Sequence, residues 1–334
     1  MKFSNRIFLY GPTALLLLLA VAAGLWWWHA ADRLSVLLDA ANGHDIVPGV
    51  RVSFSSASVG GFPFRLETRI ENLKVETRDA DGPLVWTSEH LAAHALTYGR
   101  AETIFEAAGK QSLQWRDGEH RGHGLPFAVG TMRASAILDG GALARFDLDI
   151  QGFGSPALVA GRLQFHIRRD PDADALDVWL GASNVHLSQA LRSPLGDRLS
   201  TIAIGGRFLP AAPLRPLLQG GKDWRAALAD WRVHQGRLAV DDLTLDWSKT
   251  KLSGHGELAL DSQSRPIGVL NLDLSGYDRL LQARGPHQRG IGNALLAFAA
   301  QQGAHNGSLA ARLAFKDGIA YVGTAPAAFV PPLY

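Results

Sequence analysis

The chain of 334 residues contains no cysteine. This absence excludes disulfides, thiolate zinc sites, iron–sulfur clusters and cysteine nucleophiles, and it fits either redox compartment. The net charge is only +2, and no run of basic residues alternates with aromatic ones. Nucleic-acid binding therefore has no support. Hydrophobic residues make up 47% of the chain and charged residues 19%, values that are typical of a globular protein and exclude wholesale disorder.

Recognisable catalytic motifs are scarce, since the chain has no G-x-S-x-G and no H-E-x-x-H. Gly290-Ile291-Gly292 opens a predicted helix, but Leu295 stands where a phosphate loop would have its third glycine, so we expect only a helix start there. Several carboxylates alternate with apolar residues, which predicts a solvated polar strand face rather than an acid–base pair in a cleft. These carboxylates are Asp147, Asp149, Asp241, Asp242 and Asp246. The sequence predicts no catalytic residue, no cofactor and no enzyme activity.

Twelve histidines invite a search for a metal site. His90 and His94 fall in a strand-like stretch, where residues four apart stand roughly 13 Å from each other. His120 and His123 lie in a loop rich in arginine and glycine. Asp117 and Glu119 are close to the second pair, but a metal site needs two rings brought to one ion together with a third ligand, and scattered surface histidines are the simpler interpretation. We therefore expect surface histidines and no metal.

The N-terminus predicts a membrane anchor. Lys2 and Arg6 precede an apolar run over residues 7–28 that ends in three tryptophans, and 22 residues of helix span about 33 Å, enough for a bilayer core. The basic flank predicts a cytoplasmic N-terminus with the bulk of the chain exported to the periplasm. A signal peptide cleaved after Ala22 is the alternative, although the apolar run continues past that site. Leu34, Leu37 and Leu38 have helical spacing and predict a short helix over 31–41.

The remainder reads mainly as β-strands. In the stretch 236–274 large apolar residues alternate with polar ones, and short polar breaks separate the runs, which predicts an antiparallel meander. The predicted apolar face consists of Leu243, Leu245, Trp247, Leu258, Leu260, Leu270, Leu272 and Leu274. An earlier strand over 64–70 has Arg65, Glu67 and Arg69 on its outer face. We expect six tryptophans to pack in the core, with a groove lining as the alternative: Trp86, Trp115, Trp179, Trp224, Trp231 and Trp247.

The same pattern occurs twice at a shift of about 95 residues. Gly141, Leu143, Leu148 and Ile150 precede Gly236, Leu238, Leu243 and Leu245 by 95 positions, and Leu176, Val178 and Leu180 precede Leu270, Leu272 and Leu274 by 94. An internal duplication is predicted, with chance similarity between amphipathic strands as the alternative. Short helices are expected at 187–191, 224–231, 277–283 and 290–302. The predicted organisation is an anchor with a cytoplasmic tip (1–31), a first β half (32–205), and a second β half with a C-terminal helix and hairpin (206–334).

Several short motifs together resemble a known family. They are the turn at Gly61 to Arg65, the runs Gly236 to Trp247 and Leu252 to Asp261, and the close at Pro331 to Leu333. The chain resembles the bacterial family of domain of unknown function 2125, which is distantly similar to the AsmA-like envelope proteins. Arg265 stands where the family loop has a glycine, so the resemblance does not define the conformation of that turn. The family has no established catalytic residues to carry over.

The resemblance implies strongly curved β-sheets with an apolar groove, tethered to the inner membrane and connected with envelope lipid or outer-membrane homeostasis. From the residues, two functions stay open. One is an anchored groove that binds phospholipid acyl chains on the predicted apolar face. The other is a non-catalytic envelope scaffold with a closed β core and a protein partner whose identity the sequence does not indicate.

Overall fold

The computed structural model describes residues 6–47, 49–63, 65–77, 83–96, 102–116, 121–191, 195–219, 223–276, 294–295, 297–298 and 308–334. The chain divides into two units, Met1–Gly124 and Leu125–Tyr334, here called unit 1 and unit 2. The division that the sequence placed between residues 205 and 206 lies inside a strand, because β11 runs from Arg198 to Leu209. The organisation into two β halves stays a prediction.

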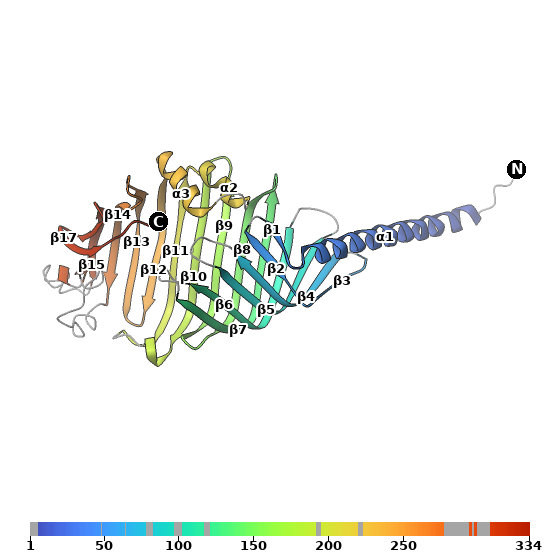
Figure 1. The fold of residues 1–334 in the computed structure, drawn as a ribbon, viewed down its shortest axis with the longest axis horizontal. Helices are drawn as coiled ribbons and strands as arrows, with labels where there is room; N and C mark the ends of the chain where they lie inside the picture. Colours follow the sequence, from blue (N-terminus) through green and yellow to red (C-terminus); the bar gives the residue numbers. More distant parts are fainter. Residues whose placement is uncertain are drawn as a thin grey trace. The chain divides into compact units, whose positions relative to one another are not determined.

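Unit 1 combines one long helix with an antiparallel sheet (Figure 1). Each of β1, β2 and β3 is short, and the strands pair in the order β1–β2–β4, with β3 also on β4, then β4–β5–β6. The predicted charged face of 64–70 is confirmed for Arg65, Glu67 and Arg69 on β4. The elements are α1 (Arg6–Ala41), β1 (His44–Val47), β2 (Val50–Ser53), β3 (Ser56–Gly60), β4 (Arg65–Thr77), β5 (Leu84–Leu96) and β6 (Glu102–Arg116).

Helix α1 is one continuous helix of 36 residues. The short helix predicted over 31–41 is its last part, and the one proline of the helix, Pro12, lies well before it. At 1.5 Å per residue the helix is about 54 Å long, well beyond the 30 Å of a bilayer core. Its segment Pro12–Ala41 is long and apolar enough to cross a membrane, which is consistent with a single-pass anchor.

Unit 2 is a long antiparallel meander in which every strand from β7 to β17 pairs with the next. The predicted fold class, mainly β with antiparallel meander sheets after an N-terminal apolar helix, is confirmed. The strands are β7 (Gly122–Asp139, which begins just before the unit boundary), β8 (Ala142–Gly154), β9 (Leu158–Asp170), β10 (Ala175–Leu187), β11 (Arg198–Leu209), β12 (Arg237–Trp247), β13 (Thr250–Leu260), β14 (Pro266–Ser275), β15 (Ser308–Lys316), β16 (Ile319–Val322) and β17 (Ala325–Phe329).

The two copies of the predicted repeat are β8–β10 and β12–β14, each a run of three consecutive antiparallel strands. The break before Pro266 is a tight turn despite its missing glycine. Arg265 donates from its backbone N and its side chain to the carboxylate of Asp261, and Ser264 takes the positive φ of 60°. The side-chain carboxylate thus supplies the turn with the hydrogen bonds that hold it closed.

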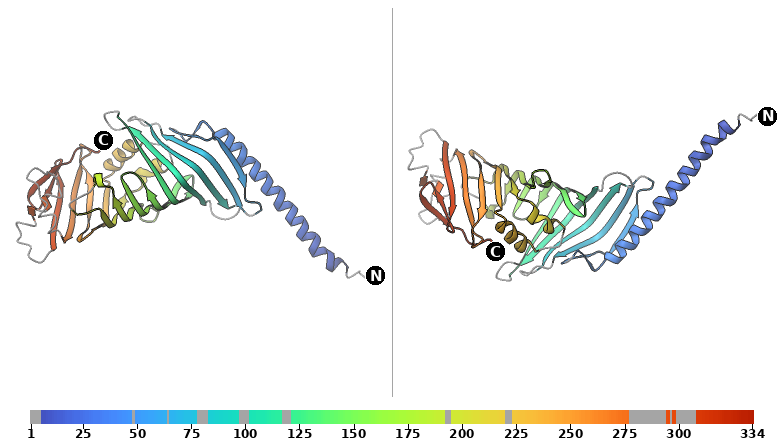
Figure 2. Two further views of the ribbon diagram at one scale, coloured as in Figure 1. Left: turned by 90° about the horizontal axis from the view of Figure 1, so that it is seen from below. Right: turned by 90° about the horizontal axis from the view of Figure 1, so that it is seen from above.

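Few helices accompany the sheet of unit 2. Besides α2 (Arg215–Leu218) and α3 (Trp224–Val233), single 3-10 turns occur at Gln189–Leu191 and Ala212–Leu214. Helix α3 was predicted over 224–231, and Asp223 caps it by accepting from the backbone N of Arg225. Figures 1 and 2 show α2 and α3 at one end of the strands, against one face of the sheet. The helix predicted at 277–283 lies outside the described residues, and of 290–302 only 294, 295, 297 and 298 are described, all helical.

Three groups of buried apolar residues form the core of unit 2. The C-terminal core joins β12–β16 with Leu295 and contains Val240, Leu270, Leu272, Leu274, Leu309, Leu313 and Val322. The middle core lies on β7–β11 and contains Val129, Ile150, Phe153, Ala160, Val185 and Leu199. The helical core packs α2 and α3 on the sheet through Leu176, Ala211, Leu214, Ala227 and Trp231. Each core therefore covers a different part of the apolar side.

Candidate functional site

The register of unit 2 aligns apolar side chains in rows across the strands. In one row Leu148 pairs with Phe165, which pairs in turn with Leu180, Ile204 and Leu243 along successive strands. In the next row Ile202 pairs with Leu245, followed by Leu252, Leu274 and Leu309. Because cross-strand partners point to the same side of a sheet, these rows form one continuous apolar face.

The eight residues predicted as lipid-facing are all at least partly buried, but different cores cover them. Leu270, Leu272 and Leu274 are buried in the C-terminal core, where Leu243 and Leu258 also pack. Leu245 and Trp247 pack on the middle core, and Leu260 on the helical core. Leu272 is only 4% exposed, so it has little surface left for a ligand. A lipid-facing role for these residues stays a prediction.

Between the cores lies an apolar strip whose residues belong to none of the three cores formed by the described part of the chain. It comprises Phe146, Phe165, Leu180, Ile202 and Ile204, and we call it the open strip. Leu180 is 52% exposed, Ile202 44% and Ile204 48%. All three lie on β10 and β11, which have neighbouring strands on both sides. Large apolar side chains half exposed in the interior of a sheet are unusual, because such positions normally face a core.

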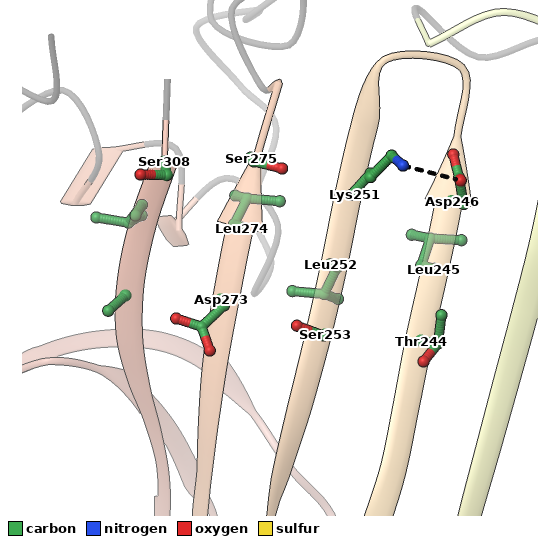
Figure 3. A pocket seen from close by; sticks show the side chains of 12 residues that line it. Thr244, Leu245, Asp246, Lys251, Leu252, Ser253, Asp273, Leu274, Ser275 and Ser308 are labelled. Carbon is green, nitrogen blue, oxygen red and sulfur yellow. Dashed lines mark ion pairs between the residues drawn. The ribbon is translucent and has the colours of Figure 1, made fainter. Parts of the chain in front are cut away.

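A cavity lies on the strands that follow β11, and most of its lining residues alternate with the apolar row, so they belong to the opposite, polar face. Ile202 is the cross-strand partner of Leu245, and Leu245, Leu252, Leu274 and Leu309 line a cavity of about 520 Å³ across β12–β15. Figure 3 shows these four strands side by side, with the ion pair between Lys251 and Asp246 at one end. The polar residues that complete its lining are Thr244, Asp246, Lys251, Ser253, Asp273, Ser275 and Ser308. At about 4.8 Å per strand, the open strip extends about 14 Å from β8 to β11.

The opposite face of the same strands carries charges. The Arg162 guanidinium donates to Asp149 at 2.6 and 3.1 Å, and this contact lowers the pKa of the Asp149 carboxyl, against the opposing effect of burial. Burial tends to raise the pKa of Asp147, but hydrogen bonds from His166 and Arg145 outweigh it and lower the pKa overall. Both carboxylates are therefore ionised at neutral pH. They lie on the strand face that was predicted to be polar.

On this polar face one tryptophan lies against the backbone. Trp179 donates from Nε1 to Asp242 at 3.0 Å, and a Cβ added at Gly205 would meet its ring at 2.5 Å. A Cβ added at Gly181, two residues after Trp179 on the same strand, would also clash with the tryptophan ring. Trp179 was predicted in the core or in a groove, but the glycines make room for it on the polar side instead.

A family model described as "Uncharacterized protein conserved in bacteria (DUF2125)" matches residues 27–331. The chain belongs to this family. No curated protein matches the chain. The match covers α1 from Trp27 onward and the strands of both units, so the DUF2125 region includes the open strip and the cavity.

Other residue patterns in this DUF2125 chain do not assemble into a reactive site. Ser248 and Lys251 have S-x-x-K spacing, but Ser248 donates to the carbonyl of Leu195 and Lys251 pairs with Asp246. His90 lies by Glu71 and His94 between Glu67 and Glu106. Within the described ranges, no group of three or more His, Asp or Glu side chains could hold a metal ion. His120 and Gly290 to Gly292 are outside those ranges.

Sequence reasoning missed Ile202 and Ile204 in this family member. The stretch Thr201 to Gly205 alternates as a strand does, yet a predicted boundary was placed at its end. Leu180 was recognised only as a repeat position. Alternation could have identified all three as facing the apolar side, but covered and open positions have the same period of two, so their exposure required the structure.

Proposed function

We propose that the protein is a membrane-anchored envelope protein whose unit 2 binds a lipid acyl chain along the open strip. The observation that carries this proposal is that the side chains of Leu180, Ile202 and Ile204 are half exposed in the middle of a sheet. The cross-strand row that runs from Ile202 to Leu245 and Leu252 supports an elongated apolar ligand rather than a compact one.

The energetics favour a ligand of this kind. Each methylene transferred from water to an apolar surface contributes about 0.8 kcal/mol, so ten methylenes contribute about 8 kcal/mol. That amount is comparable to the cost of association, estimated at 4–15 kcal/mol. A lipid that moves from the membrane to the strip exchanges one apolar environment for another, so the difference in free energy between the two states is small. We therefore propose reversible holding of lipid rather than tight storage.

The proposed location follows from the anchor. Lys2 and Arg6 precede the apolar span, and positive residues favour the cytoplasmic side. With α1 long and apolar enough to cross a bilayer, we propose an inner-membrane protein with both sheets in the periplasm, in support of envelope lipid homeostasis. A distant relation to AsmA-like proteins would agree with this role.

We also propose that the protein is not an enzyme. The strand carboxylates Asp147 and Asp149 are paired with basic side chains and have a lowered pKa. A general acid needs a proton near neutral pH, and these groups are poorly suited to hold one.

A closed scaffold is the second candidate function, favoured by the C-terminal core, which buries Leu270, Leu272 and Leu274. In that case the open strip would be the contact surface for a partner protein, and no lipid would be bound.

A pair of variants on β10 tests the proposal. Leu180 and Ser183 lie three residues apart on opposite faces, and Ser183 is the cross-strand partner of Arg162. Leu180→Glu introduces a charge into the open strip, whereas Ser183→Glu places the same charge on the polar face. The measured quantity is the lipid that co-purifies beyond the amount bound by α1. We expect Leu180→Glu to reduce it about tenfold or more, and Ser183→Glu to leave it unchanged.

Circular dichroism is the control, because both sites have room for a charge and both variants should keep the β spectrum of the wild type. Equal lipid content in the two variants, or no such lipid in the wild type, would favour the scaffold instead.

A further inference from the structure

Helix α1 is attached to the sheet of unit 1 at two levels. At its C-terminal end Asn42 donates to the carbonyl of Phe54 at 3.1 Å and accepts from the backbone N of Phe54 at 3.0 Å. Further back, Trp27 donates from Nε1 to the carbonyl of Arg65 at 2.8 Å. The two attachments flank β3, so the helix runs alongside this strand, as Figure 2 shows.

The lengths of the two elements agree. From Trp27 to Asn42 the helix rises about 22 Å, and from Phe54 to Phe62 an extended chain covers about 26 Å. The part of α1 before Trp27, starting at Arg6, is about 32 Å long, which is the thickness of a bilayer core. The helix therefore has one segment of membrane length and one segment occupied by the sheet, and they meet at Trp27.

The turn between β3 and β4 lies at this meeting point. Phe62 contacts the ring of Trp27 edge-on, with the ring centroids 5.3 Å apart, and a Cβ added at Gly24 would lie 3.8 Å from the Phe62 ring. Phe62 is nevertheless 61% exposed. The neighbouring Trp26 and Trp28 are 53% and 64% exposed. Aromatic side chains at the end of a membrane span favour the headgroup level.

We infer that the turn Gly61–Phe62–Pro63 is a second membrane contact, which inserts Phe62 into the outer lipid interface beside Trp26 and Trp28. The partner is the phospholipid bilayer surface itself. The sheet of unit 1 then begins at the bilayer without a spacer, held at a fixed height by Trp27 and Asn42. This inference rests on the proposed anchor but not on lipid binding by unit 2.

Spin-label depth measurements in phospholipid vesicles test it. Because the chain has no cysteine, single replacements report one site each in the full-length protein. Phe62→Cys probes the turn, Ser56→Cys probes the far end of β3 about 20 Å away, and Leu17→Cys probes the middle of the span. We expect the label at residue 62 to favour oxygen over a water-soluble nickel chelate several-fold, and the label at residue 56 to do the reverse.

The three sites separate the ways in which the inference can fail. A buried label at residue 17 with an aqueous one at residue 62 would overturn the turn contact and leave the anchor intact. An aqueous label at residue 17 would overturn both. If Phe62→Cys does not fold, the wild-type protein can be photo-cross-linked with a phospholipid that carries a diazirine near its ester groups. Adducts at residues 61–63 are then expected, and adducts absent there but present at residues 55–58 would contradict the inference.

Discussion

Leu180 and Leu272 have the same side chain on the same face of unit 2, but their exposed fractions are 52% and 4%. Truncation of a buried leucine removes its transfer free energy and leaves a cavity, whereas truncation of an exposed one does neither fully. We expect Leu272→Ala to lower the free energy of unfolding by about 3 kcal/mol and Leu180→Ala by less than about 1 kcal/mol. Urea denaturation measures both. Similar losses would mean that the open strip is covered in solution.

The ion pair of Asp149 with Arg162 predicts a pH dependence. The contact lowers the pKa of Asp149 below its ordinary value of 3.8 in the folded protein. A depressed carboxyl pKa stabilises the fold above the unfolded value, and this contribution is lost as the pH falls through the folded value. We expect Asp149→Asn to have a lower Tm than wild type at about pH 7, and the difference in Tm to shrink as the pH falls below the ordinary carboxyl pKa. A Tm difference that persists in acid would assign the effect to packing.

At the scale of elements, the two repeat copies make a prediction about equivalent positions. Leu148 on β8 and Leu243 on β12 fall in the same cross-strand row, and each packs at the margin of a core. Both are partly buried. We expect Leu148→Ala and Leu243→Ala to cost about 2 kcal/mol each, near the low end for leucine truncation. One mild and one severe loss in chemical denaturation would show that the equivalence is only apparent.

Most elements could be predicted because their signals are local. Alternation in 236–274 predicted β12–β14, and the helix expected over 224–231, after Gly220-Gly221, corresponds to α3. The spacing of Leu34, Leu37 and Leu38 predicted a short helix over 31–41, but its continuity with the apolar span, in a helix that packs against β3, required the structure. The boundary between halves that was predicted at Gly205-Gly206 falls inside β11, where these glycines make room for Trp179 and for close strand pairing.

The candidate site could be predicted only by its side of the sheet. Leu243 and Leu245 were placed on the correct face, and so were Leu270 to Leu274. Which part of that face stays open depends on where α2, α3 and the segment around Leu295 pack. Those contacts join residues far apart in the sequence, and no local period records them.

At the scale of the whole molecule, the orientation of the anchor is the first prediction. A reporter that is active only outside the cytoplasm, fused after Tyr334, should give signal, because Lys2 and Arg6 keep the N-terminus inside. The purified protein should retain its N-terminal residues and stay in the membrane fraction. A silent reporter would contradict the orientation, and a mature N-terminus at Ala23 would contradict the anchor.

Lipid on the open strip is the central claim, and site-specific photo-cross-linking in living cells tests it most directly. A photoreactive phenylalanine derivative replaces Ile204, and in the matched control it replaces Ser183 on the polar face. After irradiation the full-length protein is purified in detergent and its intact mass is measured. The account predicts an adduct with the mass of a phospholipid at residue 204 and none at residue 183. An adduct of protein mass at residue 204, or no lipid adduct there, would contradict it.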